Sequence, residues 1–351
     1  MKIKVAMLDH DSNYLSRIAS VFMSKFSDKI EVYSFTDSDV AVSNLKKSRI
    51  NVFIASDSFD IDVSLLPKHC GLCYLVDSQN VETHKDRPAI FKYQKPEMIF
   101  KVILDIFSGM SGIGGPRPGS NSNVRIITFS SASGGVGSSS VAVACAKGFA
   151  SAGNKTLYLN LEQFGSVESF FSGAGQMNFS DVIFALKSRK ANLFLKLESA
   201  IKQDASGVFF YGSSNTVLDM MELKADDVQR LMSDLRLAGT YDVIIVDIDL
   251  TLNTTNLVIF RDSENIVFVS DGSETSNVKF QRMYRALELL DERSEMPFIP
   301  RIAIFYNKFS SKTGKTLDYG LNEIGGAPKY ENASTEQVVA QLTGMNIFQK
   351  L

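Results

Sequence analysis

The first 108 residues alternate short apolar runs with amphipathic stretches. Residues 30–35 alternate apolar and polar side chains, which is typical of a strand, whereas Leu15, Ile18, Phe22 and Phe26 repeat at helical spacing. The strands expected from these patterns are residues 2–8, 30–35, 52–55, 72–76 and 89–93, and the helices lie around 15–26, 40–45 and 96–107. Strands that alternate with helices indicate a parallel sheet between helical layers.

Residues 109–123 interrupt this pattern. They show no apolar periodicity and consist mainly of Gly, Pro, Ser and Asn, which is typical of a flexible linker. A chain of 351 residues is long enough for two domains. The pattern therefore predicts one domain over residues 1–108 and a second over residues 124–351.

The second segment opens with a strand, a glycine-rich loop and a helix in immediate succession. Residues 124–129 are strand-like, residues 131–140 are mainly Gly and Ser, and a helix rich in Ala and Val covers residues 141–152. This order is the context of phosphate-binding loops, in which glycines let backbone N–H groups converge on an anion at a helix N-terminus. A plain flexible linker is the alternative, but the helix begins without a break.

The loop resembles the deviant Walker A sequence of the MinD/ParA family, which reads Lys-Gly-Gly-x-Gly-Lys-Thr. Alignment on the glycines places Ser133 and Ser138 at the two lysine positions and Ser139 at the hydroxyl that binds Mg²⁺. The resemblance implies a P-loop NTPase fold with a mostly parallel sheet, and a site for ATP and Mg²⁺. The residues that it assigns to the loop are Ser133, Gly134, Gly135, Val136, Gly137, Ser138, Ser139 and Ser140.

Later positions extend the resemblance. Asn160 and Glu162 follow a second strand where the family carries two Asp residues, one of them linked to the attacking water. Asp247 ends an apolar strand as a Walker B carboxylate does, which implies contact with Mg²⁺ through water. Asn307 lies where the family reads the adenine edge, and Pro328 where a loop covers the base. Taken alone, Asp247 could be a helix cap and Asn307 a turn residue.

Both lysines of the family motif are absent from the loop. A lysine–phosphate hydrogen bond is worth about 1.5–3 kcal/mol, so ATP binding is expected to weaken by about 10- to 150-fold and to survive through backbone amides and Mg²⁺. Hydrolysis depends more strongly on charge stabilisation, and losing one positive group can cost about 10³-fold. We expect at most weak ATPase activity, unless Arg125 or another basic residue substitutes in space.

The strand ends of the first segment resemble those of response-regulator receiver domains, which implies a flavodoxin-like, doubly wound fold. In that family an acidic pair binds Mg²⁺, an Asp accepts phosphate and a Lys contacts the phosphoryl group. Here His10 replaces one metal carboxylate and Ser56 stands at the acceptor position, while Asp57 is one residue late and so faces the other side of a strand. The positions of this degenerate site are Asp9, His10, Asp11, Ser56, Asp57 and Lys95. A domain used for protein contacts is therefore favoured over a working phospho-receiver.

A receiver-like domain, a linker and a lysine-poor P-loop domain together resemble the TadZ/CpaE proteins of tight-adherence pilus assembly. The resemblance implies a cytoplasmic, polar scaffold that forms an ATP-promoted homodimer and recruits pilus-assembly or other polar proteins through the receiver-like domain. The alternative is a slow MinD/ParA-like ATPase that cycles on a surface or partner complex. A signalling ATPase that is phosphorylated at the receiver rests only on Asp9 and Lys95.

Composition adds few restrictions. With 44% hydrophobic residues, 22% charged residues and a net charge of −2, the chain has no general attraction for nucleic acid. Neither a signal peptide nor a long apolar run is evident, which favours a cytoplasmic protein without direct membrane insertion. The basic stretch 187–190 is interpreted as a solvated face rather than a DNA or membrane contact, and residues 344–351 are too short and weakly basic for the membrane helix of MinD.

Cys70 and Cys73 form a C-x-x-C pair beside His69, and Cys145 stands alone. A redox pair needs its first cysteine at a helix N-terminus, and a zinc site needs two more ligands. The pair instead leads into an apolar strand. Buried structural thiols are therefore favoured over a redox or metal site.

Overall fold

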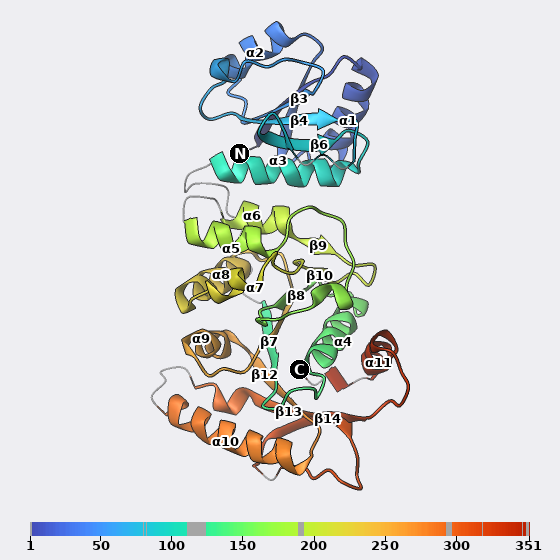
Figure 1. Cartoon of the computed structure of the whole chain (residues 1–351), viewed down its shortest axis with the longest axis vertical. Helices are drawn as coiled ribbons and strands as arrows, with labels where there is room; N and C mark the ends of the chain where they lie inside the picture. The colour runs from blue at the N-terminus through green and yellow to red at the C-terminus, as the bar shows by residue number, and fades with distance from the viewer. Residues whose placement is uncertain are drawn as a thin grey trace. The chain divides into compact units, whose positions relative to one another are not determined.

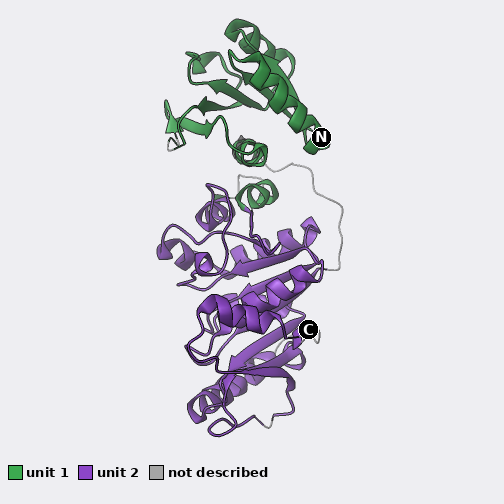
Figure 2. Cartoon of the chain, turned by 90° about the vertical axis from the view of Figure 1, so that its right-hand side faces the viewer, with its two compact units in different colours: residues 1–116, 188–200 green, residues 117–187, 201–351 purple. Residues whose placement is uncertain are grey.

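The computed structural model describes residues 2–79, 81, 83–110, 124–188, 193–292, 297–317, 319–345, 347–348 and 351. Its chain divides into two compact units, residues 1–116 with 188–200 and residues 117–187 with 201–351 (Figure 2). Of the linker expected over residues 109–123, the first two residues end a helix and the others lie outside the described residues.

Unit 1 is built on a sheet with the strand order β2-β1-β3-β4-β6-β5. β1 (Ile3–Leu8), β2 (Ile30–Phe35), β3 (Val52–Ser56), β4 (Gly71–Val76) and β6 (Arg87–Phe91) pair in parallel, and β5 (Thr83–His84) adds an antiparallel edge. The order of the parallel strands is that of flavodoxin-like, doubly wound sheets. The strands expected from periodicity are confirmed, the last of them two residues earlier than expected.

Helices pack on both faces of the unit 1 sheet. α1 (Ser12–Lys25) and α3 (Pro96–Met110) bury apolar side chains such as Phe22 and Ile103 in one core. α2 (Ser38–Lys47) contributes Leu45 to a second core on the other face. Between β3 and β4 the chain, which is described throughout, forms only the 3-10 turn η1 (Val63–Leu65). The sheet therefore carries loops where a full strand–helix alternation would place another helix.

A short helix from the middle of the chain also belongs to unit 1. α6 (Leu193–Ala200) packs against α3 and buries Leu195 in the same core. Lys196 forms an ion pair with Asp105 of α3. Periodicity predicts that such a helix has a buried face, but it does not say which core the face joins. The second domain predicted from sequence, residues 124–351, includes this helix, but the helix packs in unit 1.

Unit 2 is built on a longer sheet with the strand order β14-β13-β12-β7-β11-β8-β10-β9. Its strands are β7 (Arg125–Ser130), β8 (Thr156–Asn160), β9 (Lys202–Gln203), β10 (Phe209–Phe210), β11 (Val243–Asp247), β12 (Asn265–Ser270), β13 (Ile302–Phe309) and β14 (Asn322–Pro328). All neighbours pair in parallel except β10 with β9. Two mostly parallel sheets confirm the expected α/β class with two doubly wound domains.

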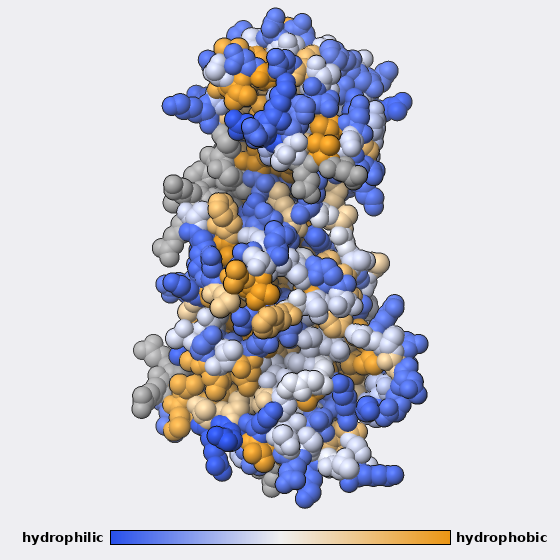
Figure 3. Space-filling view, in the orientation of Figure 1, coloured by the Kyte–Doolittle hydropathy of each residue, from blue (hydrophilic) through white to orange (hydrophobic). Residues whose placement is uncertain are grey.

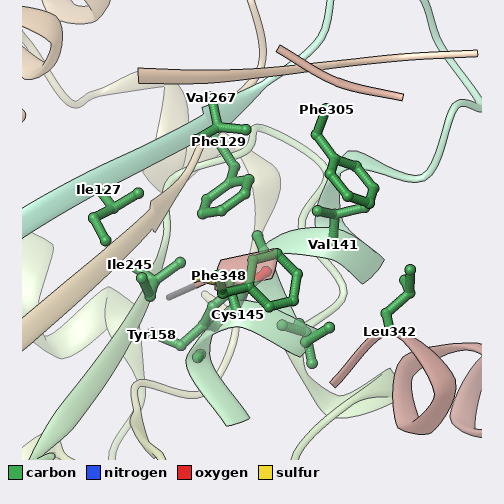
Figure 4. Close-up of a cluster of buried hydrophobic side chains, with 14 of the residues drawn as sticks. Ile127, Phe129, Val141, Cys145, Tyr158, Ile245, Val267, Phe305, Leu342 and Phe348 are labelled. Carbon is green, nitrogen blue, oxygen red and sulfur yellow. The ribbon is translucent and has the colours of Figure 1, made fainter. Parts of the chain in front are cut away.

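Helices cover both faces of the unit 2 sheet (Figure 1). They are α4 (Ser138–Ser151), α5 (Phe179–Ser188), α7 (Val217–Met221), α8 (Ala225–Ala238), α9 (Thr254–Asp262), α10 (Glu274–Asp291) and α11 (Thr335–Thr343), with the 3-10 turns η2 (Val167–Ser169) and η3 (Ile299–Arg301). Under α4 and α11, Phe129, Ile245 and Cys145 form a core with Phe348 from near the end of the chain (Figure 4). Within the described residues, no helix combines the length and apolar character needed to cross a membrane.

Candidate functional site

The site residues expected from sequence meet at one edge of the unit 2 sheet. The glycine loop follows β7, Asn160 ends β8, and Asp247 ends β11 directly beside Asn160 in the strand register. Asn307 lies near the end of β13. Because the carboxyl ends of parallel strands meet at the same edge of a sheet, residues far apart in the sequence become neighbours here.

The backbone of the loop takes a conformation that glycine permits. Gly135 and Gly137 have φ angles of +77° and +86°, and Gly137 is the N-cap residue of α4. A Cβ atom on Gly137 would lie 2.6 Å from Asn307 Nδ2. The amides of residues 134–137 donate to no other residue in the part of the chain that the structure describes. Free N–H groups at a helix N-terminus are the arrangement that binds anions.

Two serines stand where the family motif has lysines. The Oγ atoms of Ser133 and Ser138 are shielded from solvent and have no hydrogen-bond partner among the described residues. A buried hydroxyl without a partner costs free energy. These hydroxyls and the free amides of the loop therefore fit a bound phosphate, which would satisfy them.

A chain of hydrogen bonds links the loop to two carboxylates. Tyr158 donates to Asp247 Oδ2 at 2.7 Å, while Asp247 Oδ1 has no partner among the described residues. Ser139 Oγ donates to Glu162 Oε1 at 3.2 Å, and Asn160 Nδ2 donates to Glu162 Oε2 at 3.0 Å. Full burial and the nearby charge of Glu162 raise the pKa of Asp247 to about 8.

These groups also fit a divalent cation. Mg²⁺ takes oxygen ligands and is usually bound by one or two carboxylates together with water and substrate phosphates. Asp247, Glu162 and Ser139 offer such a set, and a cation would favour the ionised form of Asp247. The described residues include no group of three or more His, Cys, Asp or Glu side chains that could hold a metal.

Tyr158 was not singled out from the sequence. It lies two residues before Asn160 on β8, so strand alternation directs both side chains to the same face of the sheet. The two-residue spacing between Tyr158 and Asn160, next to a strand that ends in Asp247, could have indicated this residue from the sequence.

Asn307 and Lys308 contact the loop from β13. Asn307 is 1% exposed and donates through Nδ2 to the carbonyl oxygen of Val136 at 2.8 Å. Lys308 Nζ donates to the carbonyl oxygen of Gly135 at 2.7 Å. Asn307 thus contacts the loop, and its reading of an adenine edge stays a prediction.

Arg125 does not substitute for the missing lysines. It begins β7, at the opposite end of the strand from the loop, and its guanidinium lies 3.6 Å from Glu264. Among the described residues, Lys308 brings a cation to the loop; sequence analysis did not single it out, although it directly follows Asn307. Pro328 ends β14 and is exposed, and its contact with a base stays a prediction.

In unit 1 the acidic residue Asp9 is paired internally. Its carboxylate is buried and lies 2.8 Å from Lys92 Nζ, and Tyr14 donates through its hydroxyl to the carbonyl oxygen of Lys92. The sequence resemblance pointed to Lys95. Because β6 already ends at Phe91, Lys92 is the first residue beyond the strand and Lys95 precedes α3.

The other receiver positions have structural roles. Asp11 caps α1 by accepting from the amides of residues 13 and 14, and His10 stacks on Phe59 with the ring centroids 4.0 Å apart. Ser56 lies at the acceptor position at the end of β3, with its Oγ 2.9 Å from the Oγ of Ser58. Asp57 is exposed. The arrangement gives phosphate no buried carboxylate at the acceptor position.

The cysteines and the basic stretch 187–190 were also considered in the sequence. All three cysteines are buried and unbonded, and burial raises the pKa of Cys70 to about 12. In the basic stretch 187–190, Lys187 lies 2.6 Å from a carboxylate oxygen of Asp227, and residues 189–190 lie outside the described residues.

Comparisons with known proteins agree with both folds. Residues 1–108 match the model of the TadZ-like receiver domain. No curated protein matches the chain.

Among solved structures, a ParA family ATPase from Chlorobium tepidum aligns at 20% identity over 66% of this chain and 96% of that chain, with a TM-score of 0.51. A plasmid partition protein from Borrelia burgdorferi aligns at 19% identity over 65% and 99%, with a TM-score of 0.47. The septum site-determining protein MinD from Pyrococcus horikoshii, complexed with Mg-ADP, aligns at 16% identity over 63% and 94%, with a TM-score of 0.47.

The receiver match covers residues 1–108 and ends two residues before the end of α3. The Chlorobium structure, at 20% identity, shows a ParA fold in this chain. Residues 1–108 are therefore a TadZ-like receiver domain, and its combination with a ParA-type fold in one chain fits a TadZ/CpaE-like protein.

Proposed function

We propose that unit 2 binds ATP with Mg²⁺ and that the chain is an ATP-dependent dimerising scaffold for polar localisation and assembly of a Tad-type pilus. The observation that carries this proposal is the loop of residues 133–140. The amides of residues 134–137 and the buried hydroxyls of Ser133 and Ser138 have no partner among the described residues. The loop also meets the Asp247 and Glu162 carboxylates at one sheet edge.

The residues of the loop have separate roles in this proposal. The amides of residues 134–137 and the N-terminus of α4 hold the phosphates. Ser139 and Asp247 hold Mg²⁺, the latter through water, and the cation supplies positive charge against the phosphates. Ser133 and Ser138 carry no charge, so they cannot stabilise the negative charge that develops in the transition state of ATP hydrolysis. The site therefore binds ATP but hydrolyses it weakly or not at all.

Dimerisation is supported by the surface around the site. Small side chains in residues 131–140 would let two loops approach each other. Phe164, Leu218 and Met221 are 77%, 68% and 63% exposed. Phe164 lines a cavity of about 250 Å³ together with Asn160 and Glu162. Apolar side chains also gather at several places on the face of unit 2 in Figure 3. Large exposed apolar side chains beside a ligand site are typical of an interface.

Sedimentation analysis tests the dimer. The chain is compared without nucleotide, with ADP, and with ATP plus Mg²⁺. If ATP binds the dimer better than the monomer, ATP must tighten the dimer by the same factor. We expect the dimer only in the sample with ATP plus Mg²⁺. The dimer should persist through the run because hydrolysis is slow. Equal dimer fractions in all three samples would describe a constitutive scaffold instead.

A slow ATPase that cycles on a surface or partner complex is the second candidate. Glu162 favours it, because this carboxylate accepts from Ser139 and Asn160 near the end of β8 and could orient a water. A turnover assay with and without pilus-assembly proteins separates the two. Partner-stimulated phosphate release that Glu162→Gln abolishes would support cycling, and release at the buffer rate in all samples would support the scaffold.

A further inference from the structure

The end of β13 departs from regular strand geometry next to the glycine loop. Lys308 has a φ angle of +57°, a left-handed conformation that residues other than Gly, Asn and Asp rarely adopt. The pairing of β13 with β14 shifts register between Tyr306 and Phe309. Such a conformation persists where the surroundings enforce it, and it is often found at functional sites.

The two contacts from this segment fix consecutive peptide units of the loop. Lys308 Nζ holds the carbonyl oxygen of Gly135 at 2.7 Å, and Asn307 Nδ2 holds the carbonyl oxygen of Val136 at 2.8 Å. Each peptide unit is planar and trans, so its N–H points opposite to its C=O. With both carbonyl groups held toward β13, the amides of Val136 and Gly137 must face away from it.

We propose that Asn307 and Lys308 are positioning residues, which orient the amides of Val136 and Gly137 toward the phosphate side of the loop. The inference rests on the proposed ATP site and adds the element that keeps the site ordered before nucleotide arrives. A loop without lysines binds phosphate mainly through its amides, so their orientation before binding sets the affinity.

The side chains suit this role. An ammonium group that donates to a carbonyl makes a stronger hydrogen bond than a neutral donor. Asn307 is buried, and its Nδ2 lies 2.6 Å from the place that a Cβ atom on Gly137 would take. The approach of Asn307 therefore requires glycine at position 137. Lys308 is exposed, so its substitution removes the contact without opening a cavity in the core.

The test uses the full chain with Lys308→Met and the matched control Lys312→Met, a change at an exposed lysine four residues further along. Backbone ¹⁵N order parameters of residues 134–138 are measured without nucleotide, and ATP affinity is measured by calorimetry. We expect Lys308→Met to lower the order parameters of the loop and to weaken ATP binding by about tenfold or more, as the loss of a charged hydrogen bond implies. Lys308→Arg should restore both, and Lys312→Met should change neither.

A second variant separates the contact from backbone strain. Lys308→Gly relieves the left-handed conformation but removes the ammonium group, and it should lower the order parameters of the loop as Lys308→Met does. Wild-type order parameters and affinity in both variants would overturn the proposal. Because the order parameters are measured without nucleotide, the outcomes stay distinct: a wild-type chain that binds no ATP refutes the proposed function, whereas unchanged order parameters in the variants refute the role of Lys308.

Discussion

Replacing Asp247 by Asn is expected to stabilise the protein in the absence of Mg²⁺ and nucleotide. The side chain is fully buried, and burial together with the charge of Glu162 raises its pKa from the ordinary value of 3.8 to about 8. At neutral pH the native state therefore holds a proton that the unfolded chain releases. Asparagine resembles the protonated carboxyl group in shape and can still accept from Tyr158.

The size of the effect follows from the pKa difference. A folded-state pKa above the unfolded one gives a stability that is complete below about pH 4 and is lost as the pH rises toward 8. Each pH unit in this window is worth about 1.4 kcal/mol. Between about pH 4 and pH 7, the unfolding free energy of the wild-type chain thus falls by at most about 4 kcal/mol. Asp247→Asn does not titrate, so its advantage grows across the same window.

Urea denaturation at pH 5, 6, 7 and 8, followed by circular dichroism, measures this difference in unfolding free energy. Asp242→Asn, at an exposed position just before the same strand, controls for the loss of a carboxylate in general. A gain for Asp247→Asn that does not change with pH, or a loss of stability at pH 7, would refute the reasoning. The same variant should bind ATP with Mg²⁺ more weakly than the wild type, because the cation site loses a charge.

Other consequences concern unit 1. Lys92→Met should lower stability by about 3 kcal/mol in denaturation experiments, because it leaves the buried Asp9 carboxylate without its partner, whereas Lys92→Arg should cost less. Acetyl phosphate or beryllofluoride should leave the mass and amide spectra of the chain unchanged, and a stable adduct at Asp57 would contradict the inert receiver. Cys70 and Cys73 should resist iodoacetamide at pH 8 until the chain is unfolded, because burial raises the pKa of both thiols; rapid alkylation of the native chain would show otherwise.

The central strands of the two sheets could be predicted from sequence because they are short apolar runs with clear boundaries. The two-residue strands β5, β9 and β10 and the glycine-containing strand β14 were not expected. Asp247 and Asn160 could be placed at one edge because each directly follows such a run, and parallel strands end together. α6 could not be assigned, because an amphipathic pattern marks a buried face without naming the core that buries it.

The lysines show a similar limit. Lys95 fits the receiver motif by its neighbour Pro96, which begins α3. Lys92 reaches Asp9 instead, because β6 already ends at Phe91 and Lys92 is the next residue. Lys308 carries no motif at all. Its contact with Gly135 depends on a left-handed backbone and a register shift, neither of which leaves a pattern in the sequence.

Calorimetry with ATP tests the central claim most directly. The wild-type chain and Gly137→Val are titrated with ATP in the presence and absence of Mg²⁺. The account predicts binding by the wild type at millimolar or tighter affinity that requires Mg²⁺. It predicts no binding by Gly137→Val, because a side chain there collides with Asn307 and closes the loop to phosphate. Absence of binding by the folded wild type at millimolar ATP, or equal binding by Gly137→Val, would contradict the account.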